Sequence, residues 1–303
     1  MNVVEASGVL KDYPRVRALD GLNLKIPEGA VGLLGPNGAG KSTLIKILLG
    51  FTRPTAGTVR ILGLDPDRAP LEIRRKIGYM PEVESFIPGM SAVDYVYLAA
   101  RLSGLPHTDA MQRTHRVLNY VGLEEERYRR VETYSTGMRQ KVKFAQSIVH
   151  HPTLLLLDEP TTGLDPRARE EMLKLIRDIA HGKGIHVILS THILPDVEAV
   201  CDHVVILHRG RLVRQDALER LTSTEDAAYE VRVKGDRARF LERLDHAGLK
   251  SRETEDEALH VACADGTGPI LRAAVEAEVQ VRTLVRARSR LEDLFTKLLG
   301  EEL

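Results

Sequence analysis

The chain of 303 residues contains no tryptophan, few other aromatic residues and only two cysteines, and its charges cancel. Because 43 basic residues face 43 acidic ones, the net charge gives no global attraction to nucleic acid or to an acidic membrane. Cys201 and Cys263 lie far apart and fit no metal-ligand spacing, so we expect two core thiols in a reducing compartment. No apolar run approaches the roughly 18 residues of a membrane span, and the first residues lack the pattern of a signal peptide. We therefore expect a cytosolic globular protein.

A glycine-rich stretch after an apolar run is the strongest signal that is present. The nine residues read GPNGAGKST and fit the pattern G-x-x-x-x-G-K-[ST]. The preceding run predicts a buried strand, and the apolar residues that follow have helical spacing. Backbone N–H groups of such a loop can surround phosphate oxygens, with Lys41 near the β- and γ-phosphates and Ser42 on Mg²⁺. The predicted nucleotide-binding residues are Gly35, Pro36, Asn37, Gly38, Ala39, Gly40, Lys41, Ser42 and Thr43.

Candidate hydrolytic residues follow two further predicted strands. The uninterrupted apolar run TLLLLD ends in Asp158 and Glu159, as expected of a strand buried on both faces of a parallel sheet. Asp158 is placed to hold Mg²⁺, directly or through water, and Glu159 to orient and deprotonate an attacking water. His192 closes the next strand, where it can donate a hydrogen bond to the γ-phosphate.

Two weaker signals leave alternatives open. Ser135 and Gly137 precede a predicted helix and could form a second anion site, but an ordinary serine N-cap explains these residues at least as well. A second phosphate site makes sense if it serves the nucleotide of another copy of the chain. Tyr13 precedes the phosphate loop and could stack on adenine, although a surface-turn tyrosine is the simpler explanation from the local sequence.

The order of predicted elements divides the chain in two. Strands alternating with helices indicate an α/β domain over residues 1–221, with a mostly parallel sheet, an antiparallel β layer and a helical subdomain over about 85–150. A polar linker is predicted at 222–226. Residues 227–303 show the order β-α-β-β-α-β of a small ferredoxin-like α+β domain, with a final helix from Arg290. There we expect Val275, Val279, Val281, Leu284 and Val285 in the core.

Taken together, these motifs resemble the ATP-binding subunit of an ABC transporter over about Val3 to Leu221. The resemblance implies the ABC type of P-loop NTPase fold, with ATP and Mg²⁺ as ligands. It makes GPNGAGKST the Walker A loop, Glu159 the catalytic base, His192 the switch histidine and Tyr13 the adenine-stacking aromatic. The signature motif corresponds to Ser135, Thr136, Gly137 and Met138, and the D-loop aspartate to Asp165; both are expected to face a second subunit.

Two positions depart from the family pattern. Glu82 stands where the family usually has glutamine, and its carboxylate can ligate Mg²⁺ or its water but lacks an amide donor. Thr136 replaces a glycine of the signature and restricts the backbone there. These departures, together with Ser289 to Phe295, resemble a bacterial export-type subfamily (multidrug or sodium export).

The leading hypothesis is therefore an ATPase that dimerises on ATP and drives a separate permease, contacted near Glu82–Val93, at the cytoplasmic face of the membrane. We expect a second ATP-binding subunit, in a homodimer, and no nucleic-acid partner. The C-terminal domain is expected to add dimer contacts or to regulate the ATPase. One alternative is a soluble ABC-type ATPase that acts on ribosomes or DNA, and another is a kinase or GTPase with the same phosphate loop.

Overall fold

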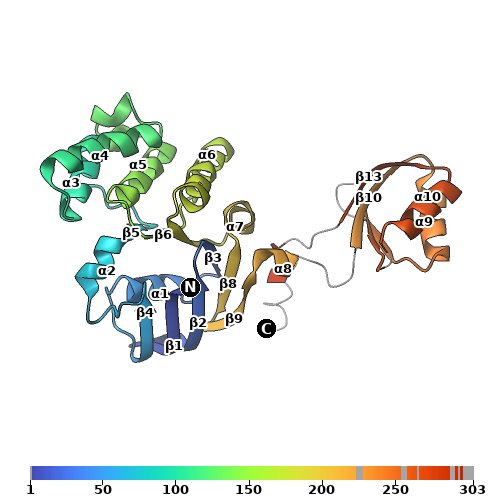
Figure 1. Ribbon diagram of the computed structural model, residues 1–303, viewed down its shortest axis with the longest axis horizontal. Helices are drawn as coiled ribbons and strands as arrows, with labels where there is room; N and C mark the ends of the chain where they lie inside the picture. The colour runs from blue at the N-terminus through green and yellow to red at the C-terminus, as the bar shows by residue number, and fades with distance from the viewer. Residues whose placement is uncertain are drawn as a thin grey trace. The chain divides into compact units, whose positions relative to one another are not determined.

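The computed structural model describes residues 2–222, 228–253, 258–264, 266–286, 291–292 and 294–295 (Figure 1). The chain forms two compact units, Met1–Leu218 and Glu219–Leu303. The predicted final helix from Arg290 lies largely outside the described residues.

A six-stranded sheet forms the centre of the first unit, in the order β5-β6-β7-β3-β8-β9. All neighbouring pairs are parallel except β8 and β9. β3 and β6 are buried along their whole length, which explains their continuous apolar sequences. The strands are β3 (Ala30–Leu34), β5 (Ile77–Met80), β6 (Leu154–Asp158), β7 (His186–Ser190), β8 (His203–His208) and β9 (Arg211–Ala217).

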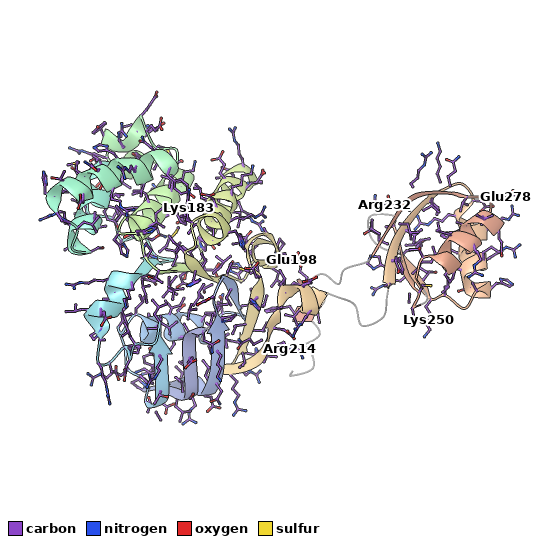
Figure 2. All side chains as sticks on the ribbon, in the orientation of Figure 1. Lys183, Glu198, Arg214, Arg232, Lys250 and Glu278 are labelled. Atoms are coloured by element: carbon purple, nitrogen blue, oxygen red, sulfur yellow. The ribbon has the colours of Figure 1, made fainter. Side chains whose placement is uncertain are left out.

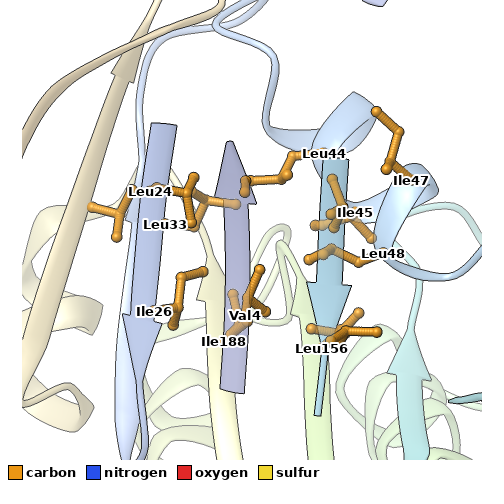
Figure 3. Close-up of a cluster of buried hydrophobic side chains, with 14 of the residues drawn as sticks. Val4, Leu24, Ile26, Leu33, Leu44, Ile45, Ile47, Leu48, Leu156 and Ile188 are labelled. Atoms are coloured by element: carbon orange, nitrogen blue, oxygen red, sulfur yellow. The ribbon is translucent and has the colours of Figure 1, made fainter. Parts of the chain in front are cut away.

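A separate antiparallel sheet has the order β2-β1-β4, with β1 (Asn2–Tyr13), β2 (Val16–Pro27) and β4 (Ala56–Ile61). It shares a hydrophobic core with the parallel sheet and with α1 (Lys41–Leu48). This core holds the start of α1 at the end of β3, where the predicted phosphate loop lies. Its labelled members in Figure 3 are Val4, Leu24, Ile26, Leu33, Leu44, Ile45, Ile47, Leu48, Leu156 and Ile188.

Three helices, α3 (Ala92–Leu102), α4 (His107–Tyr120) and α5 (Thr136–Ile148), pack together as the helical subdomain (green in Figure 1). The Ser91 hydroxyl caps α3 by accepting from the Asp94 N–H at 3.2 Å. Two 3₁₀ turns, Glu126–Tyr128 and Val131–Thr133, lead into α5. The other helices of this unit are α2 (Pro70–Lys76), α6 (Pro166–Arg177), which continues into a π-turn at Asp178–Gly182, and α7 (Leu194–Val200).

The second unit begins near α8 (Leu218–Thr222) and contains an antiparallel sheet in the order β11-β12-β10-β13. With the chain order β10-α9-β11-β12-α10-β13, this is the ferredoxin-like arrangement. Charged side chains such as Arg232 and Lys250, labelled in Figure 2, are exposed. The bounds are β10 (Ala228–Lys234), α9 (Arg237–His246), β11 (Ser251–Glu253), β12 (Leu259–Ala262), α10 (Gly268–Glu276) and β13 (Gln280–Arg286).

The core of the second unit differs from the prediction at two positions. Val279, Val281 and Leu284 pack against the buried cluster as expected. Val275 and Val285, however, are 76% and 50% exposed, so the expectation that they belong to the core was wrong. On α10 the buried positions are Ile270, Ala273 and Ala274, so Val275 lies on the outer side of the helix.

Candidate functional site

Three adjacent strands bring the predicted catalytic residues to one edge of the parallel sheet. In the order β6-β7-β3, the carboxyl ends of the strands lead into Asp158 and Glu159, into Thr191 and His192, and into the glycine-rich loop. Asp158 pairs with Ser190 of β7, and Leu33 of β3 pairs with the same residue. A cavity of about 380 Å³ opens there, lined by Tyr13, Val16, Ala18, Asn37, Gly38, Ala39, Gly40, Lys41, Ser42, Thr43, Glu82, Asp158, Glu159 and His192.

The glycine-rich loop presents the start of α1 to this cavity. No side chain caps the helix, so its first N–H groups are available for an anion. The Lys41 side chain is almost fully buried, and its Nζ donates to the Gly35 carbonyl oxygen at 2.5 Å and to that of Pro36 at 3.3 Å. Burial lowers the pKa of Lys41, while the carboxylates of Glu159, Asp158 and Glu82 oppose this shift. The ammonium is thus held at the loop, beside a site suited to phosphate.

Gly40 is required by the local geometry at the start of α1. Its φ is +105°, a left-handed conformation that side chains rarely adopt. A Cβ at this position would lie 2.7 Å from the Ala18 carbonyl oxygen and 2.8 Å from Leu19 Cδ2. The loop can therefore approach β2 this closely only because Gly40 has no side chain.

Glu159 is the best-connected acid of the cavity. Its Oε1 lies 2.9 Å from Nδ1 of His192, and its Oε2 accepts from the hydroxyls of Thr162 at 3.1 Å and Thr191 at 3.3 Å. The Glu159 side chain is 9% exposed, whereas that of His192 is 56% exposed. Glu159 also has a left-handed backbone, with φ at +50°. The arrangement holds a carboxylate at the cavity wall, with the more exposed histidine hydrogen-bonded to it.

Asp158 lies beside Glu159 and is also buried. It accepts from the Ser190 hydroxyl at 2.8 Å. Burial raises the pKa of Asp158, and the nearby carboxylates of Glu82 and Glu159 raise it further. The hydrogen bond from Ser190 and the charge of Lys41 act in the opposite direction and lower it. Three carboxylates at one cavity are electrostatically unfavourable unless a cation joins them.

The residues present fit a magnesium ion bound together with a nucleotide. Within the described ranges, no group of three or more His, Cys, Asp or Glu side chains could hold a metal ion by itself. Mg²⁺ needs less from the protein, because it takes one or two carboxylates and completes its shell with phosphate oxygens and water. Ser42, Glu82 and Asp158 line the same cavity and supply only oxygen donors.

Tyr13 lies at the end of β1 on the rim of the cavity, together with Val16 and Ala18. Its side chain is 38% exposed, and the Lys11 ammonium lies 5.1 Å from the centre of its ring. An exposed aromatic face beside the phosphate loop is compatible with base stacking. The stacking role itself stays a prediction.

The predicted signature residues and Asp165 do not line this cavity. Ser135 is exposed and caps α5, its hydroxyl accepting from the Met138 N–H at 3.3 Å. Asp165, also exposed, caps α6 by accepting from the Ala168 N–H at 2.9 Å. A Cβ on Gly137 would lie 3.2 Å from that of Ala168, so the two helix starts are close neighbours. Thr136 is exposed and Gly137 and Met138 are half-buried there.

Sequence reasoning missed a buried ion pair beside the site. Asp196 of α7 is fully buried and accepts from Nε of Arg169 at 2.6 Å and from the Thr161 hydroxyl. Thr161 follows Glu159 by two residues, Arg169 belongs to α6, and Asp196 follows His192 by four. The pair thus ties together three segments that carry predicted site residues. Nothing in the sequence distinguishes Asp196 from an ordinary acid in the first turn of a helix.

Comparisons with known proteins show what the chain is similar to. Residues 19–162 match the family model described as ABC transporter. The bacitracin transport ATP-binding protein BcrA of Bacillus licheniformis is 32% identical over 98% of this chain and 97% of its own length. The daunorubicin/doxorubicin resistance ATP-binding protein DrrA of Streptomyces peucetius is 34% identical over 98% and 92%.

A solved structure has a similar fold. The dimeric post-hydrolysis state of the ATP-binding cassette MJ0796, bound to ADP and Pi, superposes with a TM-score of 0.64 at 28% identity. The match covers 71% of this chain and 98% of that one. Over the part of the chain that the structure describes, no helix has the length and apolarity needed to cross a membrane.

Proposed function

The chain belongs to the ATP-binding subunits of ABC transporters and is an ATPase, and from this premise we propose that it is the motor of a bacterial exporter. Two copies would close head to tail over two ATP molecules and drive a separate membrane permease. One observation carries this proposal. The phosphate loop, Asp158, Glu159 and His192 line one cavity, whereas Ser135 lies exposed outside it.

Within one subunit, the proposed roles follow from the contacts. The start of α1 and Lys41 would bind the phosphates, and Ser42, Glu82 and Asp158, which line the same cavity, would hold Mg²⁺. The bound ion would neutralise charge on the β- and γ-phosphates. Glu159 accepts the proton of the attacking water, and its three donors keep the carboxylate oriented.

The second subunit would complete the site. Ser135 and the N–H groups at the start of α5 form a positive helix end that is exposed and can approach a phosphate of the partner. Asp165 lies at the neighbouring start of α6 and would face the same seam. A homodimer of this kind contains two complete sites, since one chain carries every motif. The dimer of MJ0796 supports this arrangement by likeness.

The segment Glu82–Val93 is the proposed contact with the permease. Val83 and Ile87 are 75% and 47% exposed and lie four residues apart on this segment, where they can contribute apolar area to a contact with a partner protein. Residues at the end of this segment also help to line a cavity of about 560 Å³. Its lining residues are Gly89, Ser91, Val93, Asp94, Tyr97, Met111, His115, Tyr128 and Arg130. Through this contact the subunit would be held at the cytoplasmic face of the membrane.

Export is proposed from the relatives, whose names refer to bacitracin transport and to daunorubicin/doxorubicin resistance. These relatives favour a transporter over an ATPase that acts on ribosomes or DNA, and the zero net charge adds no reason to expect a nucleic-acid partner.

The permease contact can be tested by affinity purification of the tagged chain from detergent-solubilised membranes. We expect a polytopic membrane protein to copurify, to be identified by mass spectrometry, and to be lost in a Val83→Asp/Ile87→Asp variant that still hydrolyses ATP. Leu102→Asp is the matched control, because Leu102 is 79% exposed and lies outside the proposed surface. Copurification of ribosomes in place of a membrane protein would support the alternative function.

A further inference from the structure

Side chains on α5 and just after it form hydrogen bonds with the segment that runs from β5 through Glu82 to Glu84. The side chains at positions 139, 143, 146 and 150 contact positions 84, 82, 79 and 77, respectively, so the two segments run in opposite directions. Their spacing of four, three and four residues places them along one helical face. The contacts are Arg139 Nε to Glu84 Oε1 at 2.9 Å, Lys143 Nζ to the Glu82 carbonyl oxygen at 2.9 Å, Gln146 Nε2 to that of Tyr79 at 2.8 Å, and His150 Nε2 to that of Ile77 at 3.1 Å.

Lys143 is the unusual member of this face. Its side chain is only 2% exposed, although lysine is almost never fully buried unless its ammonium is paired. Its ammonium donates to the carbonyl oxygen of Glu82, so the charge is held at the residue whose side chain lines the nucleotide cavity. Core packing alone would be satisfied by an apolar side chain at this position.

We propose that Lys143 is a positioning residue that holds the Glu82 carboxylate in the ATP site and ties it to α5. The hydrogen bond to the Glu82 carbonyl fixes the backbone of a loop that otherwise has no helix or strand at residues 81–84. The ammonium also supplies a fixed positive charge that attracts the carboxylates of Glu84, Glu82 and Asp158. The positive charge of Lys143 offsets the repulsion between the Glu82 carboxylate and the triphosphate. A glutamine at position 82 would carry no charge and would need no such partner.

The same contact links two ATP sites of the proposed dimer. Lys143 lies two turns along α5 from Ser135, which begins the helix and would meet the partner's nucleotide. Glu82 lines the nucleotide cavity of its own chain. A movement of α5 on closure would therefore also move Glu82 and the permease segment that begins there.

This inference rests on the proposed role of Glu82 at Mg²⁺, and its test separates the two. The readout is the ratio of ATP affinities with Mg²⁺ and with EDTA, measured by equilibrium binding in a Glu159→Gln background, in which turnover is expected to be slow. With Lys143 present, Glu82→Ala should lower this ratio about tenfold, because a metal ligand and a repulsive charge are lost together. In a Lys143→Met background, Glu82→Ala should lower it no more than about twofold, which is a coupling of the size seen between contacting residues.

Lys141→Met is the matched control for the same helix. Lys141 is two residues away and pairs with Glu171 at 2.9 Å, not with the loop of Glu82. In this background Glu82→Ala should keep its full, about tenfold, effect. Thermal unfolding of each variant checks that the fold is retained, and Lys143→Gln replaces Lys143→Met if the latter does not fold.

Two results would overturn different claims. If Glu82→Ala leaves the ratio unchanged with Lys143 present, the role of Glu82 at the metal is wrong. If Glu82→Ala lowers the ratio equally with and without Lys143, Glu82 acts at the metal but Lys143 does not position it.

Discussion

Replacing Asp196 by alanine tests the buried ion pair that joins the segments of Glu159, Asp165 and His192. Asp196 is fully buried, and its two partners, Arg169 and the hydroxyl of Thr161, come from other segments of the chain. The Thr161 side chain is itself only 2% exposed, whereas that of Arg169 is 33% exposed. After the substitution, the hydroxyl would be buried without its acceptor, while the guanidinium could still bind water.

The expected loss of stability follows from these exposures. A buried hydroxyl left without a partner costs about 1–3 kcal/mol. Breaking a fully buried ion pair costs about 3–5 kcal/mol, but the partial exposure of Arg169 reduces its share to about 1 kcal/mol. We therefore expect Asp196→Ala to lower the free energy of unfolding by about 3 kcal/mol. Asp196→Asn keeps an acceptor for Thr161 and loses only the charge, so its cost should be about 1 kcal/mol.

Urea denaturation, followed by circular dichroism, measures these differences. Glu170→Ala is the control, because the pair of Glu170 with Lys174 lies on the same α6 but both side chains are about two-thirds exposed. This variant should unfold with the wild type. The reasoning is refuted if Asp196→Ala loses no more stability than Glu170→Ala, or if Asp196→Asn loses as much as Asp196→Ala.

Three further predictions concern the catalytic base, the phosphate loop and the pH dependence of stability. Glu159→Gln should slow phosphate release by about 10²–10⁴ while the protein still retains ATP, and undiminished turnover would exclude Glu159 as the base. Gly40→Ala should weaken ATP binding, measured by titration calorimetry, because the Cβ of the new alanine would clash with β2. In Gly38→Ala the new Cβ would have no atom within 4 Å, so this variant should weaken ATP binding less. Burial lowers the pKa of His150, so below about pH 6.5 the unfolded state binds more protons than the folded state. The free energy of unfolding should therefore fall as the pH drops below about 6.5. A His150→Gln variant, whose side chain can still donate to the Ile77 carbonyl oxygen, should lose less stability over the same range.

The strands and the helix around the candidate nucleotide motifs could be predicted from the sequence because each motif is short and local. The phosphate loop needs its residues at fixed spacing between a strand and a helix, and the structure has β3 before it and α1 after it. Asp158 and Glu159 were found through the apolar run that precedes them, since a parallel strand buried on both faces ends where ligands bind. The βαββαβ order of the second unit could also be predicted, because its strands and helices differ in the spacing of their apolar residues.

Contacts between distant segments could not be predicted. Lys143 and Glu82 are 61 residues apart, and Asp196 reaches Thr161 across 35 residues, so no local pattern marks either contact. Before folding, Lys143 resembles any charged residue on a helix surface. Its burial arises only when α5 packs against β5, whose Gly78 allows the helix backbone to approach closely.

Elements with few apolar residues were also missed. β9 (RLVRQDA) is half-buried or exposed along its length and is the edge strand beside β8, so its sequence lacks the apolar run of the other strands. α7 begins with Leu194 and Pro195 directly after the histidine segment and is only seven residues long. Short helices of this kind are stabilised by packing, here against β3, more than by intrinsic propensity.

The central claim is that ATP bound to one chain is enclosed by Ser135 and Gly137 of a second chain. Light scattering of Glu159→Gln with ATP, compared with a Glu159→Gln/Ser135→Arg variant, tests it most directly, with ATP binding measured on both. The account predicts that Glu159→Gln becomes a dimer on adding ATP, and that the double variant binds ATP but remains a monomer. An equally stable ATP-dependent dimer of the double variant would contradict it.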